Sequence, residues 1–165
     1  MSGFSNDSSA INNALATFQS SADKGKTPYR GALAKAKELI SADIHDNPSD
    51  TTTRYSVIMV TDGHPDYNLV TVPNGNPNLG SDADVPGSVS VANSLVSAIT
   101  SLDNNNRINL NTIYYYKPDQ YSSTAVTILS SMADTGKGVF VKADTGSASL
   151  DLKHTVRIPK TTCPN

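Results

Sequence analysis

Hydrophobic residues form two different patterns along the chain. Four segments carry apolar residues at spacings of three and four, as one face of a helix does: residues 10–21, 29–40, 89–102 and 123–136. Three shorter runs are rich in β-branched and aromatic residues, which is typical of strands: residues 54–61, 107–116 and 138–143. Strands separated by helices predict an α/β, Rossmann-like fold in which helices flank a mostly parallel central sheet.

The strand at residues 54–61 is apolar at successive positions, which predicts a central strand with helices on both faces of the sheet. The chain has 165 residues and suits a single domain, residues 1–165. Residues 67–88 are rich in proline, asparagine and glycine and predict a long loop insertion. Residues 154–165 predict a C-terminal strand at a sheet edge followed by a tail, after a short helix at 147–152.

Composition and charge limit the classes of function that are expected for this protein. The net charge of −2 shows no electrostatic footprint for nucleic acid, and no apolar run approaches the length of a membrane span. The abundance of serine, threonine, asparagine and aspartate, with 17% charged residues, favours a secreted or cell-envelope protein. The N-terminal sequence lacks the basic and apolar regions of a signal peptide, so an export signal is not expected within this chain.

One carboxylate stands where an apolar strand ends. Asp62 directly follows the strand at residues 54–61, and parallel sheets bind ligands at the carboxyl ends of their strands. Read from the residues alone, Asp62 is a turn residue in an Asp-Gly turn. Thr27 precedes Pro28, which favours an extended threonine and a helix that starts with the proline.

Several stretches together resemble the later two-thirds of a von Willebrand factor A domain. They are "TPYRGALAKAKELI", "SVIMVTDGHPD", "INLNTIYYY" and "MADTGKGVFVKAD", and the resemblance covers roughly residues 10–153. It rests on the helix and strand order, a threonine before a helix, and a strand that ends in Thr-Asp-Gly. The resemblance implies a protein-binding or cell-adhesion module that uses a metal-ion-dependent adhesion site.

In that family, the site holds Mg²⁺, or Mn²⁺ or Ca²⁺, with oxygen ligands from three loops. The resemblance implies that Thr27 supplies the second loop and Asp62 the third, because these residues match the motif. Hydroxyl and carboxylate oxygens are hard ligands that suit these cations. His64, Asp66 and Tyr67 follow Asp62 and are expected to contact the partner protein.

The first ligand loop of the family, Asp-x-Ser-x-Ser, has no match before Thr27. Asp7-Ser8-Ser9 is followed by Ile11 at the third ligand position and is read as a helix cap. The domain is therefore expected to be N-terminally incomplete, with the cation held weakly or not at all by this chain alone. Its expected partners are a protein ligand, the missing N-terminal portion, a second fragment, or a second copy at an exposed sheet edge. Cys163 is the only cysteine, and its own partner stays open.

Two other functions compete with adhesion. The chain could be a structural module of a surface fibre or pilus-type assembly with a degenerate metal site. More remotely, Asp144-Thr145-Gly146-Ser147 resembles the aspartic-protease pattern, which needs two carboxylates and therefore a dimer. No nucleophile elbow, phosphate loop or zinc spacing is present, so no catalytic residues are expected and the chain is not predicted to be an enzyme.

Overall fold

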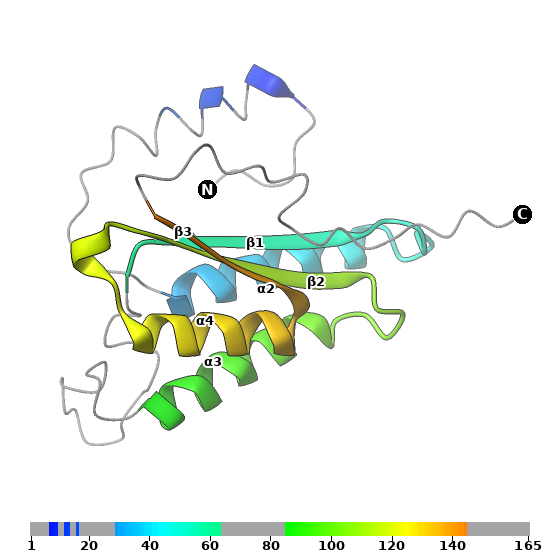
Figure 1. The fold of residues 1–165 in the computed structure, drawn as a ribbon. Helices are drawn as coiled ribbons and strands as arrows, with labels where there is room; N and C mark the ends of the chain where they lie inside the picture. The colour runs from blue at the N-terminus through cyan, green and yellow to red at the C-terminus, as the bar shows by residue number, and fades with distance from the viewer. Residues whose placement is uncertain (1–6, 10–11, 14–15, 17–28, 64–84, 145–165) are drawn as a thin grey trace, which may run out of the picture.

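A computed structural model describes residues 7–9, 12, 13, 16, 29–63 and 85–144 (Figure 1). Its elements, in chain order, are α2 (Tyr29–Asp46), β1 (Tyr55–Thr61), α3 (Val85–Thr100), β2 (Ile108–Tyr116), the 3₁₀ helix η2 (Pro118–Gln120), α4 (Ser123–Thr135) and β3 (Lys137–Asp144). Both strand pairs are parallel, in the order β1-β2-β3. The expected α/β architecture with a parallel sheet and flanking helices is thus confirmed for these residues. The helix at 147–152, the strand and tail at 154–165, and Cys163 lie outside them.

The expectation that residues 54–61 form the central strand is wrong within the described sheet. β2 lies in the middle, and its first seven residues, Ile108 to Tyr114, are all buried. β1 lies at an edge, and its residues alternate between buried or half-buried and exposed positions. An apolar run shows that a strand can be covered on both faces, but strand order depends on pairing between distant segments.

One hydrophobic core joins the three long helices to a single face of the sheet. α2 contributes Leu33 and Ile40, α3 contributes Val96 and Ile99, and α4 contributes four residues to the core: Ala125, Ile128, Leu129 and Met132. The strands add alternate residues: Tyr55, Val57 and Met59 from β1, and Ile108, Leu110 and Tyr114 from β2. Figure 1 shows α3 and α4 beneath the sheet. The described helical residues 8, 9, 12, 13 and 16 lie above it, on the opposite side.

Two helix boundaries differ from the expected ones by four residues or more. α2 continues six residues past Ile40 and ends at Asp46, because Pro48 is the first residue that cannot continue it. Its last turn is closed by Asn47, whose backbone N–H donates to the Asp43 carbonyl at 3.0 Å. α3 begins at Val85 rather than at residue 89, so the last four residues of the expected 67–88 loop are helical. Pro86 falls in the first turn, where proline is favoured.

Asp7 caps the helical residues that follow it. Its Oδ1 accepts a hydrogen bond of 2.8 Å from the backbone N–H of Ser9, as an N-cap carboxylate does. This contact agrees with the reading of Asp7-Ser8-Ser9 as a helix cap.

A bulge in β3 places one extra residue of that strand opposite β2. Leu110 pairs with Lys137 and Thr112 pairs with Phe140, so two β3 residues, Gly138 and Val139, face the single residue Asn111. The fully buried Asn111 accepts a hydrogen bond of 3.0 Å from the Val139 N–H through its Oδ1. Its amide donates to the Ser56 hydroxyl at 3.1 Å, so one side chain connects all three strands.

Replacing Asn111 with leucine is expected to lower the free energy of unfolding by about 1–3 kcal/mol, because the partly buried Val139 N–H loses its acceptor. Urea denaturation followed by circular dichroism measures the loss. The matched control is Ile113→Leu, a volume-conserving change two residues along β2 that is expected to cost less than about 1.5 kcal/mol. An Asn111→Leu variant as stable as the wild type would show that the N–H finds another partner.

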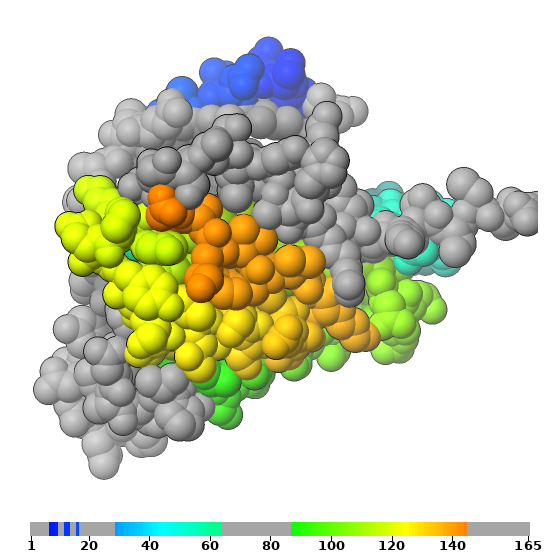
Figure 2. All heavy atoms as spheres, viewed as in Figure 1, coloured from blue at the N-terminus to red at the C-terminus, as the bar shows by residue number. Residues whose placement is uncertain are grey.

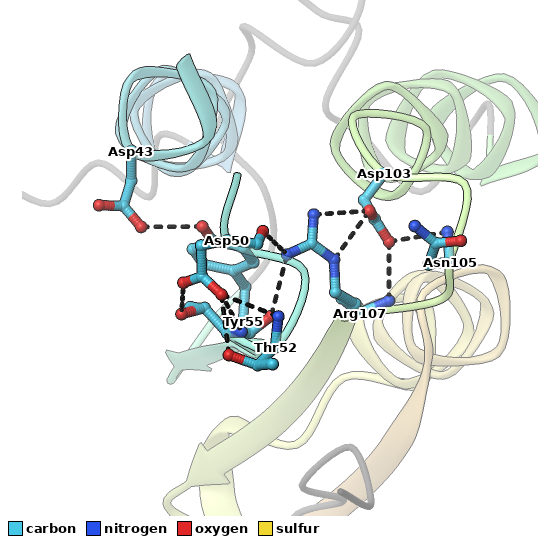
Figure 3. Close-up of polar contacts among 8 residues, drawn as sticks. Asp43, Asp50, Thr52, Tyr55, Asp103, Asn105 and Arg107 are labelled. Atoms are coloured by element: carbon cyan, nitrogen blue, oxygen red, sulfur yellow. Dashed lines mark hydrogen bonds and ion pairs between the residues drawn. The ribbon is translucent and has the colours of Figure 1, made fainter. Parts of the chain in front are cut away.

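A polar network fastens the amino end of the sheet (Figure 3). The buried Arg107 donates from Nε to Asp103 Oδ1 at 2.9 Å, and its Nη2 lies 2.8 Å from the same oxygen. Its Nη1 donates to the Asp50 carbonyl at 2.8 Å, which ties the loop before β1 to the loop before β2. The Tyr55 hydroxyl donates to Asp43 Oδ2 at 2.8 Å and adds α2 to the network.

None of the described helices has the features of a transmembrane helix. No helix among residues 29–63 and 85–144 combines the length and the apolar character that crossing a membrane requires.

In the space-filling view, α4 and β3 form much of the described surface on one side (Figure 2).

Candidate functional site

Asp62 lies at the carboxyl end of β1, at the rim where a parallel sheet presents ligand groups. β1 ends at the buried Thr61, and Asp62 is the first exposed residue after it. The Thr61 hydroxyl accepts a hydrogen bond of 3.3 Å from the Gly63 N–H and lies 3.4 Å from the Gly63 carbonyl oxygen. These contacts turn the chain sharply after the strand and leave the Asp62 carboxylate open to solvent.

The start of α2 meets this same turn. Tyr29, the first residue of α2, donates a hydrogen bond of 2.8 Å from its hydroxyl to the Gly63 carbonyl. Tyr29 is only 1% exposed, and its hydrogen bond to Gly63 is partly buried. Thr27 precedes Tyr29 by two residues in the sequence and lies outside the described part. The chain therefore enters α2 at the rim that carries Asp62.

Three tyrosines from β2 and the segment after it stand beside this turn. Tyr114 and Tyr116 stack with ring centroids 4.7 Å apart, and Tyr121 packs edge-on against Tyr116 at 5.4 Å. The Tyr114 hydroxyl donates to the Gln120 carbonyl at 3.1 Å and accepts from the Ser122 N–H at 2.9 Å. These bonds hold η2 and the start of α4 against the rim, while Tyr121 stays 49% exposed.

Two buried phenols, those of Tyr29 and Tyr114, belong to this rim: Tyr29 bonds to Gly63, and Tyr114 pairs with Thr61 in the sheet. Burial raises the pKa of Tyr29, and Tyr114 and Asp62 add to the rise against a hydrogen bond with Thr61. Burial likewise raises the pKa of Tyr114, with smaller contributions from Tyr116, Tyr121 and Asp62. Both phenols therefore stay protonated at neutral pH and act as hydrogen-bond donors rather than as anions.

The described residues place one of the sequence-predicted site residues and leave the others untested. Asp62 lies at the rim as expected, whereas Thr27, His64, Asp66 and Tyr67 lie outside the described part. Within residues 29–63 and 85–144, no group of three or more histidine, cysteine, aspartate and glutamate residues could hold a metal ion. Asp62 alone does not make a cation site, so the described residues do not fit a bound metal without further ligands.

Sequence reasoning missed the tyrosines of the rim. The run "IYYYKPDQY" at residues 113–121 carries four of the seven tyrosines in the chain, which is a visible signal at the end of a strand. Tyr29 also stands directly after Thr-Pro, at the start of a helix. Period-two alternation shows which of these tyrosines share a face, but it does not show that Tyr29 reaches Gly63.

Asp144 lies at the carboxyl end of β3, opposite Tyr116 of β2. Its surroundings are a parallel sheet backed by helices. The residues that follow it in the protease-like pattern, from Thr145 onward, are outside the described part.

Comparison of the chain with protein-family models, with curated proteins and with solved structures gave no match. These comparisons do not identify a von Willebrand factor A domain, so that resemblance rests on the sequence stretches alone.

Proposed function

We propose that this chain is a protein-binding module of the von Willebrand factor A type, working in a secreted or cell-envelope protein. Its partner would dock on the rim formed by the ends of β1 and β2 and the start of α2. The hydrogen bond of 2.8 Å between Tyr29 and Gly63 carries this proposal, because it joins the threonine-preceded helix to the Asp62 turn. In the von Willebrand factor A family, the corresponding two segments supply the second and third loops that bind the metal ion.

The rim has the character of a protein-docking surface. Tyr115 and Tyr121 are 42% and 49% exposed, and Asp62 at the end of β1 is exposed too. Tyrosine is enriched at protein interfaces, since it combines a large apolar ring with a hydroxyl. A divalent cation, when bound, would supply a positive charge that attracts an acidic residue of the partner. Asp62 and Thr27 are the residues of this chain that would hold it.

Mg²⁺ or Mn²⁺ is expected to bind this chain weakly, with a dissociation constant of about 1 mM or above, because Asp62 is its main anionic ligand. Titration calorimetry measures the affinity, and broadening of amide resonances by Mn²⁺ locates the ion. Asp62→Asn should remove both signals. The matched control is Asp119→Asn, which neutralises an exposed carboxylate in η2.

Equal broadening in the Asp62→Asn variant and the wild type would contradict the cation proposal.

One observation favours a second candidate, a structural module of a surface fibre or pilus-type assembly: no described cluster reaches three metal-ligating side chains. That module would show no cation binding at Asp62 and no dependence of partner binding on EDTA.

A further inference from the structure

A cavity of about 560 Å³ lies between α2 and the first half of β1. Four residues form its apolar wall: Ala36, Leu39, Ile40 and Val57. The rest of the lining is Asp43 and residues 53–56, so the described part of the chain forms the whole wall. Ligand cavities in proteins usually measure about 300–1,000 Å³ and are mostly apolar with a few polar groups. This cavity therefore has the size and the lining of a small-molecule site.

One residue of the wall, Arg54, carries a hydrogen-bond donor that is not satisfied. Its Nε is buried and has no hydrogen-bond partner within the described part of the chain. A buried donor without a partner costs free energy, and a buried cation is normally paired with an anion. The Arg54 side chain is only half-buried, so it can reorient and give this N–H to an anionic group in the cavity.

The other charged residue of the wall, Asp43, already has a partner on each of its oxygens. Its Oδ2 accepts a hydrogen bond of 2.8 Å from the Tyr55 hydroxyl (Figure 3), and its Oδ1 accepts one of 3.1 Å from the side-chain amide of Asn47. The negative charge of Asp43 disfavours a second negative charge close to it. Together, Arg54 and Asp43 favour a ligand with a single negative charge and an uncharged apolar body.

We propose that this cavity binds a monocarboxylate with an apolar chain, which is the chemistry of a medium-chain fatty acid. The planar guanidinium of Arg54 would pair with the carboxylate, a match that arginine makes with two parallel hydrogen bonds. The apolar chain would lie against Leu39, Ile40 and Val57 and leave water. This site is separate from the rim, because Asp62 stands five residues beyond Val57, past the opposite end of β1.

Titration calorimetry with octanoate, carried out in EDTA, tests the site independently of the cation proposal. We expect a dissociation constant of about 1 mM or below for the wild type. Arg54→Gln removes the charge and should weaken octanoate binding at least about tenfold. The neutral probe 1-octanol has the same chain length and should bind the wild type at least about tenfold more weakly than octanoate does. Lys117→Gln removes an exposed positive charge after β2 and should leave octanoate binding unchanged.

A second variant tests the apolar part of the cavity. Ala36→Leu places a larger side chain in the wall and should weaken octanoate binding at least about fivefold, while leucine preserves the helix. Circular dichroism checks that each variant folds. Asp62→Asn should bind octanoate as the wild type does, so a failure of the rim proposal leaves this result intact.

Two results would overturn the proposal. One is a wild type that does not bind octanoate at concentrations up to about 10 mM. The other is an Arg54→Gln variant that folds and binds octanoate as tightly as the wild type, because the cavity would then not recognise the carboxylate through Arg54.

Discussion

Replacing Arg107 with alanine is expected to lower the free energy of unfolding by about 3–5 kcal/mol, because it leaves the Asp103 carboxylate buried without its counter-ion. The Arg107 and Asp103 side chains are 7% and 4% exposed. The guanidinium also loses its bond of 2.8 Å to the Asp50 carbonyl, which joins residues 57 apart in the sequence. Chemical denaturation followed by circular dichroism measures the change.

Two further variants separate the ion pair from the loss of side-chain volume. Arg107→Lys keeps the charge but lacks the planar fork that reaches both Asp103 and the Asp50 carbonyl, so its loss should be intermediate. Asp103→Ala combined with Arg107→Ala should cost less than the sum of the single variants, because neither charge is then left alone. Additive losses in this cycle would argue against direct coupling.

The pH dependence of the free energy of unfolding gives an independent check of the ion pair between Arg107 and Asp103. Burial would raise the pKa of Asp103, but hydrogen bonds from the Arg107 side chain and from the backbone N–H groups of Arg107 and Asn105 outweigh it, and the pKa is lowered. A lowered folded-state pKa adds stability above the unfolded-state pKa, about 4, which is lost as the pH falls through the folded-state value. The difference in stability between wild type and Arg107→Ala should therefore shrink below about pH 4.

Gly138→Ala is expected to destabilise the fold by about 3 kcal/mol or more, since the added methyl group meets backbone rather than a movable side chain. A Cβ at this position would lie 2.0 Å from the Leu110 carbonyl oxygen and 2.5 Å from its carbonyl carbon. Relief requires β3 to move away from β2 at the bulge, which would also strain the bond between Val139 and Asn111. Thermal and urea unfolding measure the loss.

Gly136→Ala provides the comparison for this bulge. Its added methyl group would lie 2.7 Å from the Leu110 Cβ and 3.0 Å from the Leu110 carbonyl oxygen, which is a smaller overlap than the 2.0 Å approach at Gly138. Its cost should be smaller than that of Gly138→Ala. The reverse order, or a Gly138→Ala variant with wild-type stability, would mean that the bulge readily opens.

The predictions for Arg107 and Gly138 both concern contacts that set the position of the candidate site but lie outside that site. The Arg107 network fixes the amino ends of β1 and β2, and the register runs from Tyr55 opposite Ile108 to Thr61 opposite Tyr114. Asp62 follows Thr61 directly, so its position relative to the end of β2 depends on this register. A shift of one residue would carry its side chain to the other face of the sheet.

Local patterns in the sequence determined much of what the structure contains. Apolar spacings of three and four located α2, α3 and α4, because side-chain spacing follows backbone geometry within one helix, and short runs of β-branched and aromatic residues located the three strands. The alternation of strands and helices predicted parallel pairing, since parallel strands need a crossover connection. The position of Asp62 at the rim followed from its place after β1.

Tertiary structure alone decided the strand order and the contacts of the site. Hydrophobic periodicity describes one segment at a time, so it could not show that β2 rather than β1 is central. It also could not show that Tyr29 reaches Gly63, or that Asn111 joins β1 to β3. Each of these contacts depends on residues 28 or more positions apart, and such pairs meet only when the helices pack on the sheet and select one register.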